Sequence, residues 1–134
     1  MNKIKALPVR TYRVRYMFED QLTSCTENEE DAKENVLNRL MNHMPAIEKL
    51  LGMTIIKEDF ILDAAHKETL EKNYHRYNVF FELEAEETID GTSEEEVTAK
   101  ANQKVKQVID KIDKLLGTTF RENTTYVKVV TSLS

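Results

Sequence analysis

Two segments of the chain alternate between apolar and polar residues, which is the pattern of a strand with one buried face. They cover residues 11–18 and 77–86. The apolar positions that we expect to face a core are Tyr12, Val14, Tyr16, Phe18, Tyr77, Val79, Phe81, Leu83 and Ala85. The opposite face then carries Arg13, Arg15 and Met17 on the first strand and Asn78, Phe80, Glu82 and Glu84 on the second.

Two longer segments repeat apolar residues every three or four positions, as an amphipathic helix does. In residues 28–51 this stripe comprises Val36, Leu40, His43 or Met44, Ile47 and Leu51. A capping-box sequence at residues 92–96 precedes a second stripe, which comprises Val97, Ala101, Val105, Val108, Ile109, Ile112 and Leu116. Gly52 and Gly117 follow the two stripes, as left-handed helix caps do. Pro45 predicts a kink or a restart of the first helix near Met44.

The remaining segments are less clearly patterned. Residues 54–63 are predicted to form a strand, and the β-branched and aromatic residues 125–131 predict a last one. Residues 64–76 contain helix formers without a clean period, so they fit either a short helix or a long hairpin connection.

The two halves of the chain align without a gap when 65 is added to the residue number. The shared helix end Lys-Leu-Leu-Gly, at residues 49–52 and 114–117, is the strongest part of the match. Two helices that end alike by coincidence are the alternative interpretation, because Leu-rich ends closed by Gly are common. We expect a duplicated β-α-β unit.

Two right-handed β-α-β units interleave into a ferredoxin-like β-α-β-β-α-β fold of the α+β class. This plan predicts an antiparallel four-stranded sheet in the order second, third, first, fourth, with both helices on one face. We expect one domain over residues 1–134: a basic N-terminal arm at 1–10, a first repeat at 11–63, a connector at 64–76 and a second repeat at 77–131.

Composition supports one folded domain and indicates the cellular compartment in which it is found. The 134 residues are 40% hydrophobic and 32% charged, the balance of a globular chain. Their apolar runs are far shorter than the roughly 20 residues of a membrane span or the stretch that a signal peptide needs. Cys25 is the only cysteine, which fits a reducing compartment. We therefore expect a cytoplasmic protein that contacts no membrane.

Charge argues against direct nucleic-acid binding, because the net charge of -5 offers little to replace phosphate counterions. RNA-reading sheets of this fold expose several aromatic residues on the third strand, whereas here Phe80 stands among glutamates. The loop at residues 21–28 has neither the Gly and Arg of a phosphate cradle nor a Cys-x-x-Cys pair for a metal.

Three side chains are candidate reactive groups. Cys25 lies beside a predicted helix start, where the helix dipole lowers thiol pKa values, but nothing in the sequence places a histidine beside it. His66 and His75 would converge on a metal, with Asp59 and Asp63 nearby, if the connector folds back as a hairpin. Their spacing matches no recognised ligand motif, so solvated surface residues are the simpler interpretation. His43 is interpreted as a partly buried packing residue. We predict no catalytic residue, no metal site and no cofactor.

Acidic residues gather around both predicted helix starts, and residues 77–99 contain acids and no base. Acids in a first helical turn complement the helix dipole, which explains many of them. The acids that continue from the third predicted strand into the loop exceed that need and suggest docking to a basic partner. The candidate protein-binding residues are Glu82, Glu84, Glu86, Glu87, Asp90, Glu94, Glu95 and Glu96, with Met17 and Phe80 on the predicted uncovered sheet face.

The leading hypothesis is a non-catalytic protein-binding module. Richness in Lys, Glu, Asn and Ile is typical of low-GC bacteria and their phages, so the hypothesis extends to a phage or mobile-element inhibitor of a basic, nucleic-acid-handling host protein. The alternative is a small dimeric enzyme or ligand-binding domain with a pocket at the subunit interface. Unpaired strand edges and the exposed Met17 and Phe80 also predict a homodimer.

Overall fold

The computed structural model of the chain describes residues 8–56, 60–123 and 125–132. Its elements, in chain order, are β1 (Arg10–Thr26), α1 (Glu29–Leu51), β2 (Thr54–Ile56), β3 (Ile61–Glu71), β4 (Tyr74–Gly91), α2 (Glu94–Leu116), the 3-10 turn η1 (Phe120–Glu122) and β5 (Tyr126–Ser132). The chain is therefore an α+β protein with two helices and a five-stranded antiparallel sheet, which is compatible with a ferredoxin-like arrangement. Most of the predicted basic arm, residues 1–7, lies outside the described residues.

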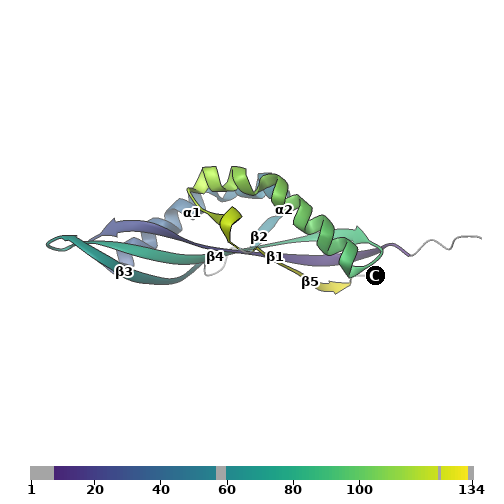
Figure 1. Cartoon of the computed structure of the whole chain (residues 1–134), viewed down its shortest axis with the longest axis horizontal. Helices are drawn as coiled ribbons and strands as arrows, with labels where there is room; N and C mark the ends of the chain where they lie inside the picture. The colour runs from purple at the N-terminus through teal and green to yellow at the C-terminus, as the bar shows by residue number, and fades with distance from the viewer. Residues whose placement is uncertain (1–7, 57–59, 124, 133–134) are drawn as a thin grey trace, which may run out of the picture.

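The sheet is built around the long antiparallel pair β1 and β4. Its strand order is β2-β4-β1-β5, and β3 also pairs with β4. Both helices lie over the same face of the sheet, and the β3–β4 hairpin forms one end of an elongated molecule (Figure 1). No helix of the described residues lies over the other face of the sheet. We call it the open face.

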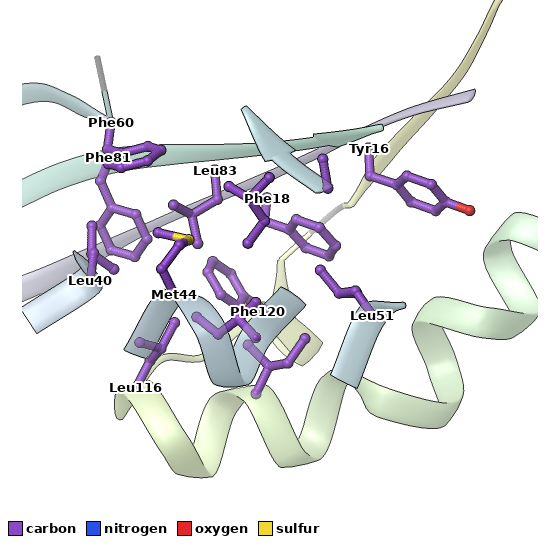
Figure 2. Close-up of a cluster of buried hydrophobic side chains, with 14 of the residues drawn as sticks. Tyr16, Phe18, Leu40, Met44, Leu51, Phe60, Phe81, Leu83, Leu116 and Phe120 are labelled. Atoms are coloured by element: carbon purple, nitrogen blue, oxygen red, sulfur yellow. The ribbon is translucent and has the colours of Figure 1, made fainter. Parts of the chain in front are cut away.

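The core lies between the helices and the sheet, as the alternation predicts. All the strand positions expected to face inward, from Tyr12 to Ala85, are buried. Figure 2 shows the centre of this core, where Phe120 of η1 reaches the side chains of the central strands. The Phe120 ring centroid lies 5.6 Å from that of Phe18 and 5.9 Å from that of Phe81. A short turn after α2 thus closes the core.

A buried carboxylate holds that turn in place. Asp113, near the end of α2, accepts hydrogen bonds from the Thr118 hydroxyl at 2.6 Å, the Phe120 amide at 2.8 Å and the Arg121 amide at 3.1 Å. Only 5% of Asp113 is exposed. A buried carboxylate needs such partners, because an unpaired one is strongly destabilising.

The helices follow the predicted stripes, with one difference. Val36, Leu40, Met44, Ile47 and Leu51 are buried on α1, and the predicted stripe of α2 is buried except for the partly buried Val108. The expected restart near Met44 is wrong, since α1 runs through Pro45 to Leu51. Pro45 lies on the exposed side of the helix, so the hydrogen bond that it removes faces water while the buried stripe still holds the helix to the sheet.

The strands extend further than the alternation predicts. β1 continues from Phe18 to Thr26, and β3 and β4 occupy most of residues 64–76, where a connector was expected. Of the two alternatives for that segment, the hairpin is correct and the helix is wrong, and its turn lies at Lys72 and Asn73. The expected single strand at 54–63 is instead β2 and the start of β3, which gives five strands and not four. The added part of β1 and most of β3 are polar, and both pair with β4 although most of their side chains are exposed.

Corresponding elements of the two halves have matching bounds. α1 and α2 each contain 23 residues, and their first residues, Glu29 and Glu94, differ by 65 positions. Each helix is capped by a side chain, Asn28 or Ser93, and ends at a left-handed glycine. Phe18 and Leu83, which also differ by 65, lie directly opposite each other at the middle of the β1–β4 pair.

Candidate functional site

The open face brings together four of the predicted binding residues, Met17, Phe80, Glu82 and Glu84, and one that was not chosen, Glu19. In the β1–β4 register, Glu19 lies directly opposite Glu82, and Met17 lies opposite Glu84. Side chains two residues apart on a strand share a face, so Glu19, Glu82 and Glu84 are neighbours on the open face. We call these three residues the acidic cluster.

Placing like charges side by side changes how the acidic cluster ionises. Partial burial of Glu82, hydrogen bonds to Glu84 and Glu19, and the charges of these two carboxylates raise the pKa of Glu82 to about 7. Like charges directly opposite each other in a sheet are destabilising. Near neutral pH the acidic cluster therefore holds a proton about half of the time, and a cation from another molecule would release it.

Apolar side chains border the acidic cluster. Phe80 is 37% exposed, Leu62 is 58% exposed and Tyr126 is 50% exposed. Together with Glu19 and Gln21 they line a hollow of about 370 Å³ in the sheet. Aromatic and aliphatic side chains beside charged ones form the usual composition of a protein-binding surface.

The other end of the open face is basic and internally paired. Glu86 accepts from Arg13 Nε at 2.8 Å and from Arg15 at 3.2 Å, so two arginines of β1 pair with one glutamate of β4. Lys128 of β5 lies opposite Arg15. The charge of Glu86 is thus neutralised within the chain, unlike that of the acidic cluster.

The remaining predicted acids lie away from the acidic cluster, in separate surroundings. Glu87 is on the helix side of the sheet, where it accepts from the Tyr16 hydroxyl and pairs with Lys104 at 2.7 Å. Burial, followed by the bond to Glu87, raises the pKa of Tyr16. Asp90 accepts from the Thr11 hydroxyl at 2.6 Å, at the far end of the strand pair.

Of the three acids in the first turn of α2, one is hydrogen-bonded to the residues before the helix and two are exposed. Glu96 accepts from the hydroxyl and the amide of Thr92, and these bonds, with Lys100, lower the pKa of Glu96 to about 2. Glu94 and Glu95 are exposed in the first turn. Ser93 caps the helix by accepting from the Glu96 amide at 3.2 Å, whereas the Glu96 carboxylate reaches Thr92, one residue before the cap, so only half of the predicted capping box is present. These three acids do not join the acidic cluster.

The candidate reactive groups do not assemble as a cysteine–histidine pair. Cys25 lies opposite Arg76 and Thr26 lies opposite His75, so the side chains of Cys25 and His75 point to opposite faces of the sheet. His66 and His75 do meet across the β3–β4 hairpin, with ring centroids 5.1 Å apart. His43 is half-buried on α1, as interpreted, and Asp59 lies outside the described residues.

Sequence reasoning missed Glu19, Leu62 and Tyr126 as parts of this surface. Glu19 has the parity of Arg13, Arg15 and Met17, so a longer first strand would have placed it on the open face. Its position opposite Glu82 depends on the register, for which the equivalence of Phe18 and Leu83 under the 65-residue offset was the available signal. Leu62 and Tyr126 belong to weakly patterned strands and gave no comparable signal.

Among the described residues, no three or more His, Cys, Asp or Glu side chains are grouped so as to hold a metal ion. None of the helices in the described part of the chain is long and apolar enough to cross a membrane. No protein-family model and no curated protein matches this chain. The geometry of the open face is therefore the basis for assigning a function.

Proposed function

We propose that the chain is a non-catalytic protein-binding module whose open face binds a partner that presents basic and apolar side chains. The observation that carries this proposal is the acidic cluster beside Phe80, Leu62 and Tyr126 on a sheet face that no helix covers. Such a partner would supply positive charge to the acidic cluster and apolar contact area to the three exposed side chains.

The acidic cluster favours a basic partner. Three neighbouring carboxylates repel one another, and Glu82 is held partly protonated in the free chain. A lysine or arginine placed among them replaces repulsion by attraction and releases the proton. Peripheral charge of this kind raises the association rate and rejects acidic partners.

The apolar border supplies the contact area that charge alone does not. Large apolar side chains are exposed around this hollow, whose lining also includes the polar residues Glu19 and Gln21 of β1. Burying apolar surface contributes about 25 cal/mol per Å² removed from water. An aliphatic or aromatic side chain of the partner that enters this hollow would anchor the complex, while the acidic cluster would orient it.

Proteins that handle nucleic acids are the partner class that fits best, because they carry basic surfaces that neutralise phosphates. The composition of the chain supports an origin in a phage or mobile element, and inhibition of a host protein of that class is the corresponding role. The arginines that the structure places on the open face, Arg13 and Arg15, lie at its other end and pair with Glu86, so the proposed binding surface itself is acidic.

We also infer that the fold arose by duplication of a β-α-β unit in a ferredoxin-like plan. The matching helix bounds, the matching caps and the central Phe18–Leu83 pair support this inference. Glu19 and Glu84 are equivalent residues under the duplication. The antiparallel pairing of the two copies sets Glu19 opposite Glu82, which lies two residues from Glu84 on the same strand.

A homodimer through the open face is the competing use of the same surface. The face of β4 presents Glu82, Glu84 and Glu86 in a row, and a twofold axis perpendicular to the strands would set this row against its own copy. Repulsion between like charges opposes that contact when the carboxylates are ionised. We therefore propose that the homodimer forms at lower pH, where Glu82 is protonated, and that the basic partner binds at higher pH.

Capture from a lysate with matched variants tests the proposed function. The test variant is E19Q/E82Q/E84Q, and the control is E34Q/E94Q/E95Q, which removes the same charge at exposed positions on the helices. We expect wild type and control to retain the same protein, eluted by salt, and the test variant to lose it. If the test variant and the control retain identical sets of proteins, the open face is not the binding surface.

A further inference from the structure

The β3–β4 hairpin brings together two histidines that are distant from the acidic cluster in the register. The turn is Lys72-Asn73, and Asn73 adopts a left-handed φ of 65°, which asparagine tolerates better than most residues. Next to the turn, Thr69 pairs with His75 and His66 pairs with Tyr77. His66 lies opposite Tyr77, whose side chain shares a face with that of His75 two residues away, so both imidazoles lie on the same side of the hairpin. The register shift between His66 and Glu68 adds Thr69 to that side.

Three polar atoms of this hairpin form a compact triangle. His66 Nε2 lies 3.3 Å from His75 Nδ1, and Thr69 Oγ1 lies 3.2 Å from the first nitrogen and 3.0 Å from the second. The buried Tyr77 ring packs edge-on against both imidazoles, with centroid distances of 5.6 Å to His66 and 6.0 Å to His75. The tyrosine therefore holds two otherwise solvent-facing rings in one orientation.

We propose that His66 and His75 form a surface site for a divalent metal ion of the zinc class, bound through Nε2 of the first and Nδ1 of the second. In a tetrahedral zinc site with Zn–N distances of 2.0–2.1 Å, two ligand atoms are about 3.3–3.4 Å apart. The observed separation of 3.3 Å matches that edge of the tetrahedron. Thr69 Oγ1 occupies the position of a third vertex, where it can contact the ion or hydrogen-bond to a water on it.

The chemistry of the donors selects this class of ion. Imidazole nitrogen suits Zn²⁺, Ni²⁺ and Cu²⁺, whereas Mg²⁺ and Ca²⁺ prefer oxygen ligands. A neutral imidazole carries its ring hydrogen on either nitrogen, so both facing nitrogens can present a lone pair once that hydrogen moves to the far side of its ring. With two protein ligands in place of four, we expect a zinc dissociation constant of about 1 to 100 µM.

The site differs from the metal arrangement considered from the sequence. That arrangement added Asp59 and Asp63 to the two histidines, but Asp63 lies opposite Phe80, on the open face, and its carboxylate accepts from the amide of Ala64. The third position belongs instead to Thr69, which the sequence does not mark as a ligand. The two histidines converge because the connector is a hairpin.

Calorimetric titration of the untagged full chain with zinc chloride at pH 7, where zinc hydroxide does not precipitate, tests the proposal. We expect wild type to bind one ion and the H66A/H75A variant to bind at least about 20-fold more weakly. H43A serves as the control histidine and E82Q as the control for adventitious binding to the acidic cluster; both should bind as wild type does. Circular dichroism of each variant verifies that it folds.

A second measurement needs no substitution. Zinc should shift the NMR signals of the ring nitrogens of His66 and His75 and leave those of His43 unchanged. The proposal is overturned if wild type shows no saturable binding below about 1 mM zinc, a limit far weaker than two imidazoles provide. It is equally overturned if H66A/H75A binds as wild type does or if zinc leaves both ring signals unchanged.

Discussion

Replacing Glu82 by glutamine should stabilise the protein at alkaline pH, although Glu82 makes hydrogen bonds in the native state. E82Q keeps the size of the side chain and its ability to donate to Glu19 and Glu84, while it removes the charge that these carboxylates repel. Glu82 has a pKa of about 7 in the folded chain, compared with its ordinary value of 4.5. A carboxyl whose pKa is raised by folding stabilises the folded state when protonated, and this contribution is lost as pH rises towards 7.

The size of the effect follows from that shift. One pKa unit corresponds to about 1.4 kcal/mol, so the difference between 4.5 and about 7 sets an upper limit of about 3.5 kcal/mol for the penalty of ionising Glu82 in the folded chain. Solvent screening at this partly exposed site reduces the expected gain of E82Q to about 1–2 kcal/mol at pH 8. At pH 4.5 the gain should fall below about 0.5 kcal/mol, because Glu82 is then already neutral in the folded wild type.

Urea unfolding at pH 4.5 and pH 8 measures this difference without adding salt that would screen the charges. At pH 8 the midpoint of E82Q should lie about 0.5–1 M urea above that of wild type. E34Q removes an exposed carboxylate on α1 and should leave the midpoint unchanged within error at both pH values. A gain that is equal at the two pH values, or a loss at pH 8, would show that burial and the neighbouring carboxylates do not hold the pKa of Glu82 above its ordinary value.

Two further predictions concern the turn that closes the core and self-association. D113N replaces a carboxylate oxygen that accepts hydrogen bonds by an amide NH₂ group that cannot accept them, so it should lower the free energy of unfolding by about 2–3 kcal/mol in urea titrations. D110N, at an exposed site, should change the free energy of unfolding by less than about 0.5 kcal/mol. An equal effect of the two substitutions would reject the role of Asp113. Sedimentation velocity at high concentration should show more homodimer at pH 5.5 than at pH 8, and E82Q should dimerise similarly at both; a dimer of wild type that is insensitive to pH would place its interface elsewhere.

The sequence predicts the core of this protein well, because apolar residues that are buried on one face of a helix or strand recur at a regular spacing. Leu40, Met44 and Ile47 recur at helical spacing, and Val79, Phe81 and Leu83 at strand spacing, and all of them are buried. The glycine caps at Gly52 and Gly117 are also readable, since few residues other than glycine adopt the left-handed conformation readily.

The sequence does not predict the strands that are held by backbone pairing with a neighbouring strand more than by burial of their side chains. Along β3, Ala64 is the buried position, so backbone hydrogen bonds to β4 hold a strand whose side chains carry little alternation. The second half of β1, from Glu19 to Thr26, is similar. Local patterns do not record such strands, because the information lies in the partner strand.

The candidate site shows the same limit. Alternation places Glu82 and Glu84 on one face, but it does not distinguish them from Glu86, which Arg13 and Arg15 neutralise. Only the register of β1 against β4 separates the paired carboxylate from the acidic cluster, and only the hairpin register brings His66 to His75. Charge counted along the chain therefore overestimates the acidic surface that is free to bind a partner.

NMR of the ¹⁵N-labelled chain, recorded as the captured partner is added, shows whether the open face binds a basic partner. We expect amide signals to shift at Met17, Glu19, Phe80, Glu82, Glu84 and Tyr126. The shifts should vanish for E19Q/E82Q/E84Q but persist for E34Q/E94Q/E95Q. Shifts concentrated on the outer surfaces of α1 and α2, with the open face unchanged, would contradict binding at the open face.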